Sequence, residues 1–360
     1  RRQRLKDYSS RELILKVFSG ERTDKVANFD LLRNRKAVEF FSGEKLTENE
    51  HDSLRVVTAA CRKVLDMTRT IRVPLSTPIE KEESGFVKLY QDWTSWIIVR
   101  PFRDYSSFQD WVRLDVERLK NWEPAEEYLE NLRRDFEQKQ QLLGDTVLMW
   151  HVGEGWFYEP YNEAGIENFS YLWYDDHSLF SDWLDLRFYQ KRTIVERLVD
   201  GQKFPIAFIG EDIAHKTGTI FSPAMLEKEF FPRLKVLVDL FHKKEMKVVF
   251  HSDGNLMQVL DQIVATGVDG LHPIEPMAGM KLARVRDLCP NRMVLIGNLD
   301  CSQLLPFGSK KEIEEEVKKI MDLAKSTGNI IFSSSSELHD EIPLENIVWM
   351  FECFEKYRRY

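Results

Sequence analysis

The 360-residue sequence lacks several features that would assign it to a common class. It has no GxGxxG or GxxxxGK[ST] motif, which argues against an open dinucleotide-binding sheet and a P-loop nucleotide site. The four cysteines stand far apart and form no CxxC pair, so we expect reduced thiols rather than a disulfide framework. No apolar run approaches the roughly 18 residues that span a bilayer, and the charged first residues do not resemble a secretory signal.

The chain also has fewer basic than acidic residues. The chain carries 51 basic and 59 acidic residues, a net charge of −8, whereas proteins that bind nucleic acid depend on Lys and Arg to neutralise phosphates. The 43% of hydrophobic residues and 31% of charged residues are typical of a globular protein. Together with the cysteines, this composition predicts a cytoplasmic enzyme that binds neither nucleic acid nor membrane.

Eight short apolar runs recur along the chain, and amphipathic stretches such as 222–244 and 309–328 follow the later ones. Continuous apolar runs without strict alternation are typical of parallel strands that are buried on both faces. The eight runs are residues 26–31, 67–73, 146–152, 205–212, 247–253, 268–274, 292–298 and 329–335. Eight such strands with helices between them predict an α/β fold, a (β/α)8 TIM barrel.

The first part of the chain is less regular. Residues 74–103 alternate between polar and apolar side chains like an antiparallel insertion, and residues 104–142 contain two charged helical patterns. No Pro/Gly/Ser-rich linker separates these segments from the rest. We therefore predict a single domain over 1–360, in which 1–145 includes an N-terminal helical and antiparallel elaboration and 146–360 is the most regular part.

Polar side chains gather where the predicted strands end. In a (β/α)8 barrel the C-terminal ends of the strands share one mouth and carry the chemistry, and five of the eight histidines lie at such ends. The adjacent acids after 205–210 need charge partners or a ligand, since buried carboxylates are rarely left alone. The predicted catalytic residues are His251, Glu211, Asp212 and Asp66. The predicted substrate-binding residues are Trp156, Tyr161, Trp93, Glu154, His151, Asn298 and Ser336.

The residues after the fourth predicted strand resemble a known family. The stretch 209–255, IGEDIAHKTGTIFSPAMLEKEFFPRLKVLVDLFHKKEMKVVFHSDGN, is similar to the uroporphyrinogen decarboxylase superfamily, and 259–276, 293–300 and 330–347 continue the resemblance. The resemblance implies a (β/α)8 barrel with one of two chemistries. One is decarboxylation of uroporphyrinogen without a cofactor. The other is methyl transfer between a corrinoid protein and a small donor or acceptor.

The thiol-methylating branch of the superfamily holds zinc through a His-x-Cys motif and a later cysteine, and the zinc ionises an acceptor thiol. Here His251 matches the histidine, whereas Asp253 and Ser336 stand at the cysteine positions. The resemblance implies zinc as a cofactor, with His251, Asp253 and Glu211 as candidate ligands. It also implies a partner corrinoid protein that carries a methylcobamide, and a small-molecule methyl donor or acceptor.

Three functions remain open at this point. We favour a corrinoid-linked methyltransferase, because the expected mouth is acidic and aromatic rather than arginine-rich and an RQAGR motif is absent from 26–38. The first alternative is a decarboxylase, in which Asp66 stabilises a cationic intermediate and Arg69 or Arg72 receives carboxylates. The second is a non-catalytic barrel that has lost its metal site, as Asp253 and Ser336 suggest.

Overall fold

The computed structural model describes residues 8–151 and 155–360. Its main sheet has five parallel strands in the order β7-β10-β11-β12-β13, and β2 pairs in parallel with β6. The bounds are β2 Met67–Arg69, β6 Val147–Met149, β7 Ile206–Gly210, β10 Lys247–His251, β11 Gly270–His272, β12 Val294–Leu299 and β13 Ile330–Ser334. These seven strands coincide with seven of the eight predicted runs.

Single-residue parallel bridges close the sheet into a ring. Trp150 pairs with Ala207 and so joins β6 to β7, while Phe29 pairs with Met67 at the start of β2. Asn28, beside Phe29, pairs with Phe332 in β13. The segment 28–29 is therefore the first of eight parallel strands in sequence order, and the predicted (β/α)8 barrel is confirmed.

The inside of the barrel is filled by apolar side chains from the strands and from helix α1 (Ser10–Phe18). Ser9 begins α1 with a capping box, since its side chain accepts from the backbone of Glu12 and the Glu12 carboxylate accepts from the backbone of Ser9. Leu13, Ile14, Val17 and Phe18 pack among the inward-facing residues of the strands. The helix thus closes the N-terminal end of the barrel, which leaves the opposite end, the mouth, for chemistry.

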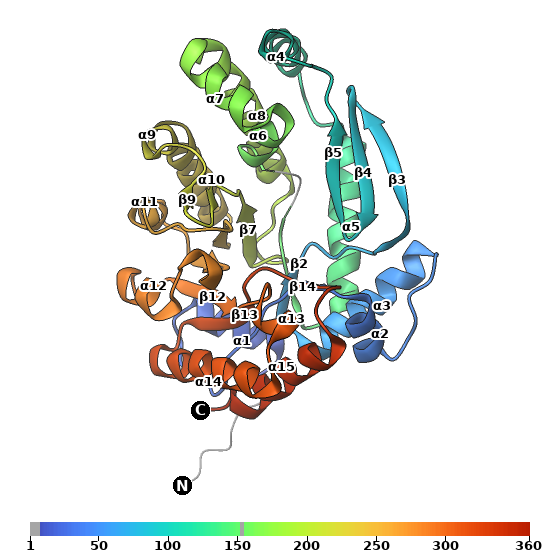
Figure 1. The fold of residues 1–360 in the computed structure, drawn as a ribbon, viewed down its shortest axis with the longest axis vertical. Helices are drawn as coiled ribbons and strands as arrows, with labels where there is room; N and C mark the ends of the chain where they lie inside the picture. The colour runs from blue at the N-terminus through green and yellow to red at the C-terminus, as the bar shows by residue number, and fades with distance from the viewer. Residues whose placement is uncertain (1–7, 152–154) are drawn as a thin grey trace.

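Helices cover the outside of the strands (Figure 1), and their ends largely follow the sequence signals. Helix α14 begins after the capping residue Ser309 and ends at Gly328, which adopts φ of 79°. The helix expected over 222–244 is interrupted by a π-helical turn, Leu226–Phe230. Pro343 is the N-cap of α15. The other bounds are α2 Arg35–Ser42, α3 Glu50–Val64, α8 His177–Leu198, α9 Pro223–Met225, α10 Phe231–Lys243, α11 Leu260–Ala265, α12 Leu282–Leu288, α13 Leu304–Phe307, α14 Lys310–Thr327 and α15 Leu344–Tyr357.

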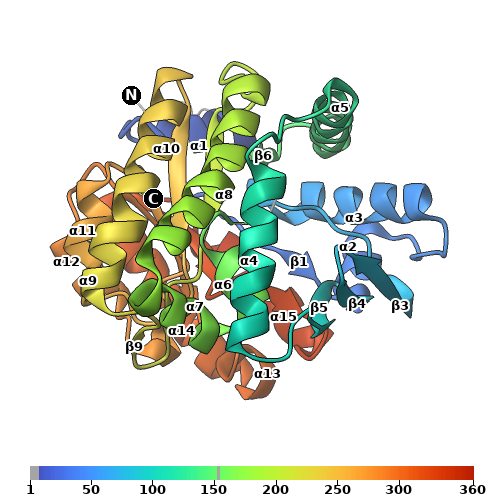
Figure 2. The same cartoon turned by 90° about the horizontal axis from the view of Figure 1, so that it is seen from above.

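The predicted elaboration is present as an antiparallel sheet and two long helices. Strands β3 (Leu75–Glu83), β4 (Phe86–Asp92) and β5 (Thr94–Val99) form the sheet, and α4 (Tyr105–Leu119) and α5 (Glu126–Leu143) follow. Seen from above, β3–β5 lie with α2 and α3 on the side away from α9–α12 (Figure 2).

Helices α6 (Tyr158–Ala164), α7 (Ile166–Asp175) and α8 follow β6 and were not predicted from the sequence. They rise above the strand ends opposite β3–β5, so that the two groups of elements flank the mouth (Figure 1). Two short strand pairs also lie after barrel strands: β1 (Leu32–Arg33) pairs with β14 (Leu338–His339), and β8 (Ala214–His215) pairs with β9 (Gly218–Thr219).

The four cysteines are free and buried, as their spacing predicted. Among the described residues, no helix has the length and apolar character that crossing a membrane requires.

Candidate functional site

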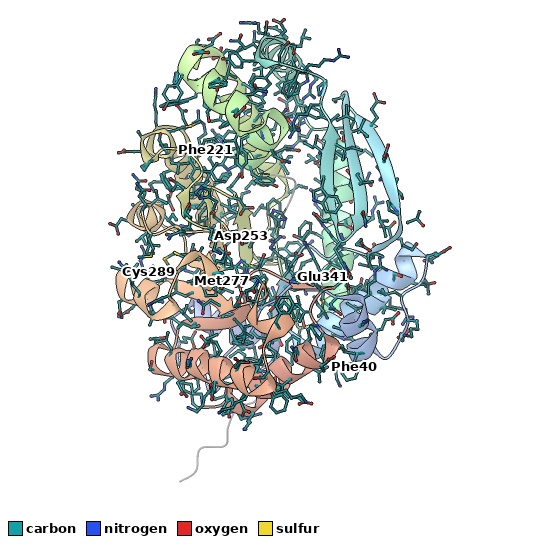
Figure 3. The ribbon with its side chains drawn as sticks, viewed as in Figure 1. Phe40, Phe221, Asp253, Met277, Cys289 and Glu341 are labelled. Carbon is teal, nitrogen blue, oxygen red and sulfur yellow. The ribbon has the colours of Figure 1, made fainter. Side chains whose placement is uncertain are left out.

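Three polar side chains meet at the mouth, where β7 and β10 end. Asp212 follows β7, His251 is the last residue of β10, and Asp253 follows it. Nε2 of His251 lies 3.6 Å from Oδ1 of Asp212 and 3.8 Å from Oδ1 of Asp253. We call these residues the Asp–His–Asp cluster. Figure 3 shows Asp253 near the centre of the molecule, between the barrel and α6–α8.

The cluster is shielded but open to a ligand. The side chains of Asp212 and Asp253 keep 34% and 44% of their surface exposed, whereas that of His251 keeps 9%. Burial, together with the negative charges of Asp212 and Glu275, raises the pKa of Asp253 to about 8. Burial also raises the pKa of Asp212. Two carboxylates that resist ionising together favour a proton or a cation between them.

The imidazole of His251 is held by a second histidine. Its Nδ1 lies 2.7 Å from Nδ1 of His272, and the two rings stack with centroids 4.9 Å apart. Burial lowers the pKa of both histidines well below the usual value, so both are neutral at pH 7. One Nδ1 must then donate and the other accept. When His251 donates, the lone pair on its Nε2 faces the two carboxylates.

Arginines also reach the mouth, which corrects the expectation that it is not arginine-rich. The guanidinium carbon of Arg69 lies 4.1 Å from the centroid of the Phe208 ring, on the barrel's inner side. Burial, followed by the charges of Arg33 and Arg72, lowers the pKa of Arg69 to about 9. Arg33 pairs with Glu337 at 2.5 Å, and Arg72 donates to the carbonyl of Trp93.

Glu211, predicted as a catalytic residue and metal ligand, does not join the cluster. Its carboxylate accepts the backbone N–H groups of Trp156, Phe157 and Tyr158 at 2.7, 3.2 and 2.7 Å. Burial raises its pKa to about 8, although these donors oppose the shift. Consecutive residues at a strand end point to opposite sides, so Asp212 and Glu211 cannot both face the mouth. Glu211 instead anchors the turn that begins α6.

The three predicted aromatic residues are buried in packing. Trp156 stacks on Phe230 with ring centroids 5.0 Å apart, and the Tyr161 hydroxyl donates to the backbone carbonyl of Asp212 at 2.6 Å. Trp93 donates from Nε1 to Asp340 at 2.7 Å and lines a cavity of about 560 Å³ beside β3–β5. Tyr161 therefore supports the cluster from behind, while Trp93 belongs to a different cavity.

The other predicted binding residues are dispersed. His151 lies near Arg69, because both side chains contact the ring of Phe208; the ring centroids of His151 and Phe208 are 5.4 Å apart. Asn298 donates to the backbone carbonyls of Ile274 and Met280, at 3.0 and 3.3 Å, which is a structural role. Ser336 is half-buried after β13. Glu154 lies outside the described residues.

The structure contradicts the placement of Asp66 at the site. Asp66 precedes β2 and so lies at the N-terminal end of the barrel, opposite the mouth. Its carboxylate accepts from Ser10 at 2.7 Å, from the backbone of Asn28 at 3.1 Å and from Arg358 at 2.5 Å. These bonds tie α1 and the C-terminus to the closed end, so a structural role replaces the predicted catalytic one.

Two mouth residues were underrated from the sequence. His272 was not among the predicted site residues, although the β10–β11 register pairs it directly with His251. Arg69 entered only the decarboxylase alternative. A signal was available in both cases, since the residues lie in the predicted strand runs 67–73 and 268–274, and the structure ends β2 and β11 at them.

Comparison with known proteins identifies the region that carries the cluster. Residues 208–357 match the family model of uroporphyrinogen decarboxylase (URO-D). This part of the chain is similar to the URO-D family domain. It contains His251, Asp253 and His272, together with Asp212 and Phe208, whereas Arg69 lies outside the matched residues.

Curated relatives of both kinds are similar to the chain. A methylcobamide:CoM methyltransferase, MtbA of Methanosarcina acetivorans, is 29% identical over 132 residues, which cover 37% of each chain. A uroporphyrinogen decarboxylase of Geobacter sulfurreducens is 27% identical over 141 residues, 39% of each chain. A uroporphyrinogen decarboxylase of Syntrophotalea carbinolica is 36% identical over 75 residues, 21% of each. The chain thus spans less than two fifths of the length of these relatives.

One solved structure is similar over nearly the whole chain. A methyltransferase from Methanosarcina mazei superposes with a TM-score of 0.71, covering 98% of this chain and 99% of the other, at 15% sequence identity. At that identity the likeness establishes the fold, including the elaboration, and leaves the reaction to be argued from the site.

Proposed function

We propose that the chain is a corrinoid-linked methyltransferase that acts on a small methylated compound. The observation that carries this proposal is the Asp–His–Asp cluster, a neutral imidazole between two partly exposed carboxylates at the barrel mouth. The similarity to a methylcobamide:CoM methyltransferase supports the same chemistry. Members of the URO-D family are enzymes, and methyl transfer is the reaction that this cluster fits best.

The cluster fits a divalent cation such as zinc. One potential ligand atom from each of Asp212, His251 and Asp253 lies within 4.8 Å of the other two, and Oδ1 of Asp253 is shielded with no hydrogen-bond partner among the described residues. Three protein ligands with a fourth position left open are typical of catalytic zinc. When bound, the cation would act as a Lewis acid on the substrate oxygen. Two carboxylates in place of thiolates favour an oxygen ligand over a thiol, so a methyl ether or alcohol is the preferred substrate type.

The protein's own groups prepare this site. In the tautomer that suits a cation, Nδ1 of His251 donates to Nδ1 of His272, 2.7 Å away, and the lone pair of His251 Nε2 is directed at the carboxylates. Tyr161 and the backbone N–H of Asp253 fix Asp212, the N–H at 3.0 Å from its Oδ1. A cytoplasmic corrinoid protein would dock over the mouth between β3–β5 and α6–α8, because its cobalt must approach the methyl group in line.

A methyl-transfer assay tests the proposal. The purified chain is given cob(I)alamin or methylcobalamin with a panel of methyl ethers, alcohols and thiols, and methyl transfer in either direction is measured. We expect transfer with the oxygen compounds and a loss of about 100-fold in His251→Gln. The control is His215→Gln, because His215 is exposed and its ring bonds the carbonyl of Gly218. Absence of transfer in every combination contradicts the proposal and favours the non-catalytic barrel.

A decarboxylase is the second candidate, because Arg33, Arg69 and Arg72 stand at the mouth and two of the relatives described above are uroporphyrinogen decarboxylases. Its test is the loss of acetate carboxyl groups from uroporphyrinogen under anaerobic conditions. Decarboxylation without methyl transfer would favour this candidate. The position of Asp66 at the closed end, where it pairs with Arg358, argues against the version that relied on this residue.

A further inference from the structure

Two arginines at the mouth each carry a buried Nε–H donor. Nε of Arg69 and Nε of Arg33 are both shielded from solvent and have no hydrogen-bond partner among the described residues. An unsatisfied buried donor costs about 1–3 kcal/mol, and more when the group is charged. Arg33 at least pairs with Glu337. Arg69 donates only to Thr70 Oγ1, at 3.2 Å, and no carboxylate of the described residues lies within 4.0 Å of it.

The position of Arg69 relates it to the Asp–His–Asp cluster. Its guanidinium covers the Phe208 ring, and the centroid of that ring lies 5.3 Å from the centroid of His251. A single aromatic side chain therefore separates the two groups. Phe208 itself is buried, whereas Arg69 is only partly buried, and the charge of Arg69 acts on Asp212, His251 and Asp253. A ligand that reaches the guanidinium of Arg69 therefore lies close to the cluster.

The surrounding charges favour an anion at Arg69. Arg33 and Arg72 add positive charge nearby, and burial with these charges lowers the pKa of the guanidinium. An anion would relieve that repulsion and fill the unsatisfied donors. A carboxylate suits this role because its two oxygens match the planar fork of a guanidinium. A bare phosphate could supply the same charge, so the test must separate the two.

We propose that Arg69, with Arg33 and Arg72 beside it, binds a carboxylate of the substrate, so that the methylated compound is a small carboxylic acid. This inference rests on the proposed methyltransferase function and specifies its substrate class. The carboxylate binds at Arg69, and the methyl-bearing oxygen faces Asp212, His251 and Asp253.

Calorimetric titration of the full chain with matched pairs of compounds tests the subsite. Methoxyacetate is compared with 2-methoxyethanol, 3-methoxybenzoate with methoxybenzene, and inorganic phosphate is the third arm. We expect at least one acid to bind at least tenfold more tightly than its neutral counterpart. Arg69→Gln should weaken binding of that acid at least tenfold, and Arg69→Lys less, because Lys keeps the charge but not the fork. The control is Arg103→Gln at an exposed arginine.

Several results would overturn the subsite. These are equal binding of each acid and its neutral counterpart, unchanged affinity in Arg69→Gln, or phosphate that binds as tightly as the acids and depends equally on Arg69. If Arg69→Gln does not fold, Arg69→Lys decides: its affinity for the acid must fall at least threefold. Methyl transfer from neutral ethers alone would retain the proposed function and reject the subsite. Arg69-dependent acid binding without any methyl transfer would retain the subsite and reject the proposed function.

Discussion

The Nδ1 atoms of His251 and His272 lie 2.7 Å apart at the ends of two adjacent barrel strands. Because burial keeps both rings neutral, this contact contains a single proton. The position of that proton decides whether Nε2 of His251 offers a lone pair or an N–H group to Asp212 and Asp253. His272 touches neither carboxylate within hydrogen-bond distance among the described contacts, so it acts as a positioning residue for His251.

Removing the partner of His251 should weaken cation binding. We expect His272→Leu to lower zinc affinity about 10–100-fold, as loss of an outer-shell hydrogen bond typically does, measured by competition with a chelator of known affinity. His272→Asn retains an acceptor near the same place and should recover part of the loss. Equal affinities in wild-type protein, His272→Leu and His272→Asn would show that His251 needs no orienting partner.

The Asp66–Arg358 ion pair at the closed end should affect stability and not the site. Removing one partner of a buried ion pair costs about 3–5 kcal/mol, because the other charge is left uncompensated. Asp66→Asn should therefore lower the free energy of unfolding by about that amount in a urea titration. Its zinc affinity should match that of the wild type. A variant with normal stability and lost methyl transfer would return Asp66 to the catalytic role that the sequence suggested.

Glu229, on the π-helical turn, should make stability depend on pH. Burial alone would raise its pKa, but hydrogen bonds from His177, Trp173 and Arg233 outweigh burial and hold the pKa below its usual value. Such a carboxylate stabilises the fold above its unfolded pKa, and that contribution disappears as pH falls through the folded pKa. Glu229→Gln should lower the free energy of unfolding by about 1.5–3 kcal/mol at pH 7.

The free energy of unfolding of both proteins is measured by urea titration at pH 7 and at pH 3.5. At pH 3.5 the difference in free energy between Glu229→Gln and the wild type should be much smaller. Glu227→Gln, at an exposed position on the same turn, serves as the control and should change little at either pH. A loss of stability that is the same at both pH values would mean that the charge of Glu229 is irrelevant and that only packing was disturbed.

The barrel was predictable because its strands are buried on both faces and leave long apolar signatures. All eight runs became barrel strands, and the alternation over 74–103 became β3–β5. The extra helices after β6 were missed, in part because α8, the longest of them, has only a weak apolar period. The π-helical turn in 226–230 also leaves no signature, because its backbone differs from an α-helix only by one inserted residue.

The site was predictable in part. Position at a strand end made His251, Asp212 and Asp253 candidates, and the structure brings them together, since parallel strands deliver their C-terminal residues to one mouth. The sequence could not tell which of Glu211 and Asp212 faces inward, because that depends on strand register and on the turn that Glu211 anchors. Asp66 was predicted to lie at the mouth. Asp66 instead precedes β2, so it lies at the N-terminal end of the barrel, whereas residues after a strand lie at the mouth.

The rate of methyl transfer to cob(I)alamin in variants of the Asp–His–Asp cluster tests the central claim most directly. If the three residues act as one unit, His251→Gln and Asp253→Asn each slow transfer about 100-fold, and the double variant is scarcely slower than the slower single variant. Wild-type rates in the single variants would contradict the account. So would losses that multiply in the double variant, because His251 and Asp253 would then act independently.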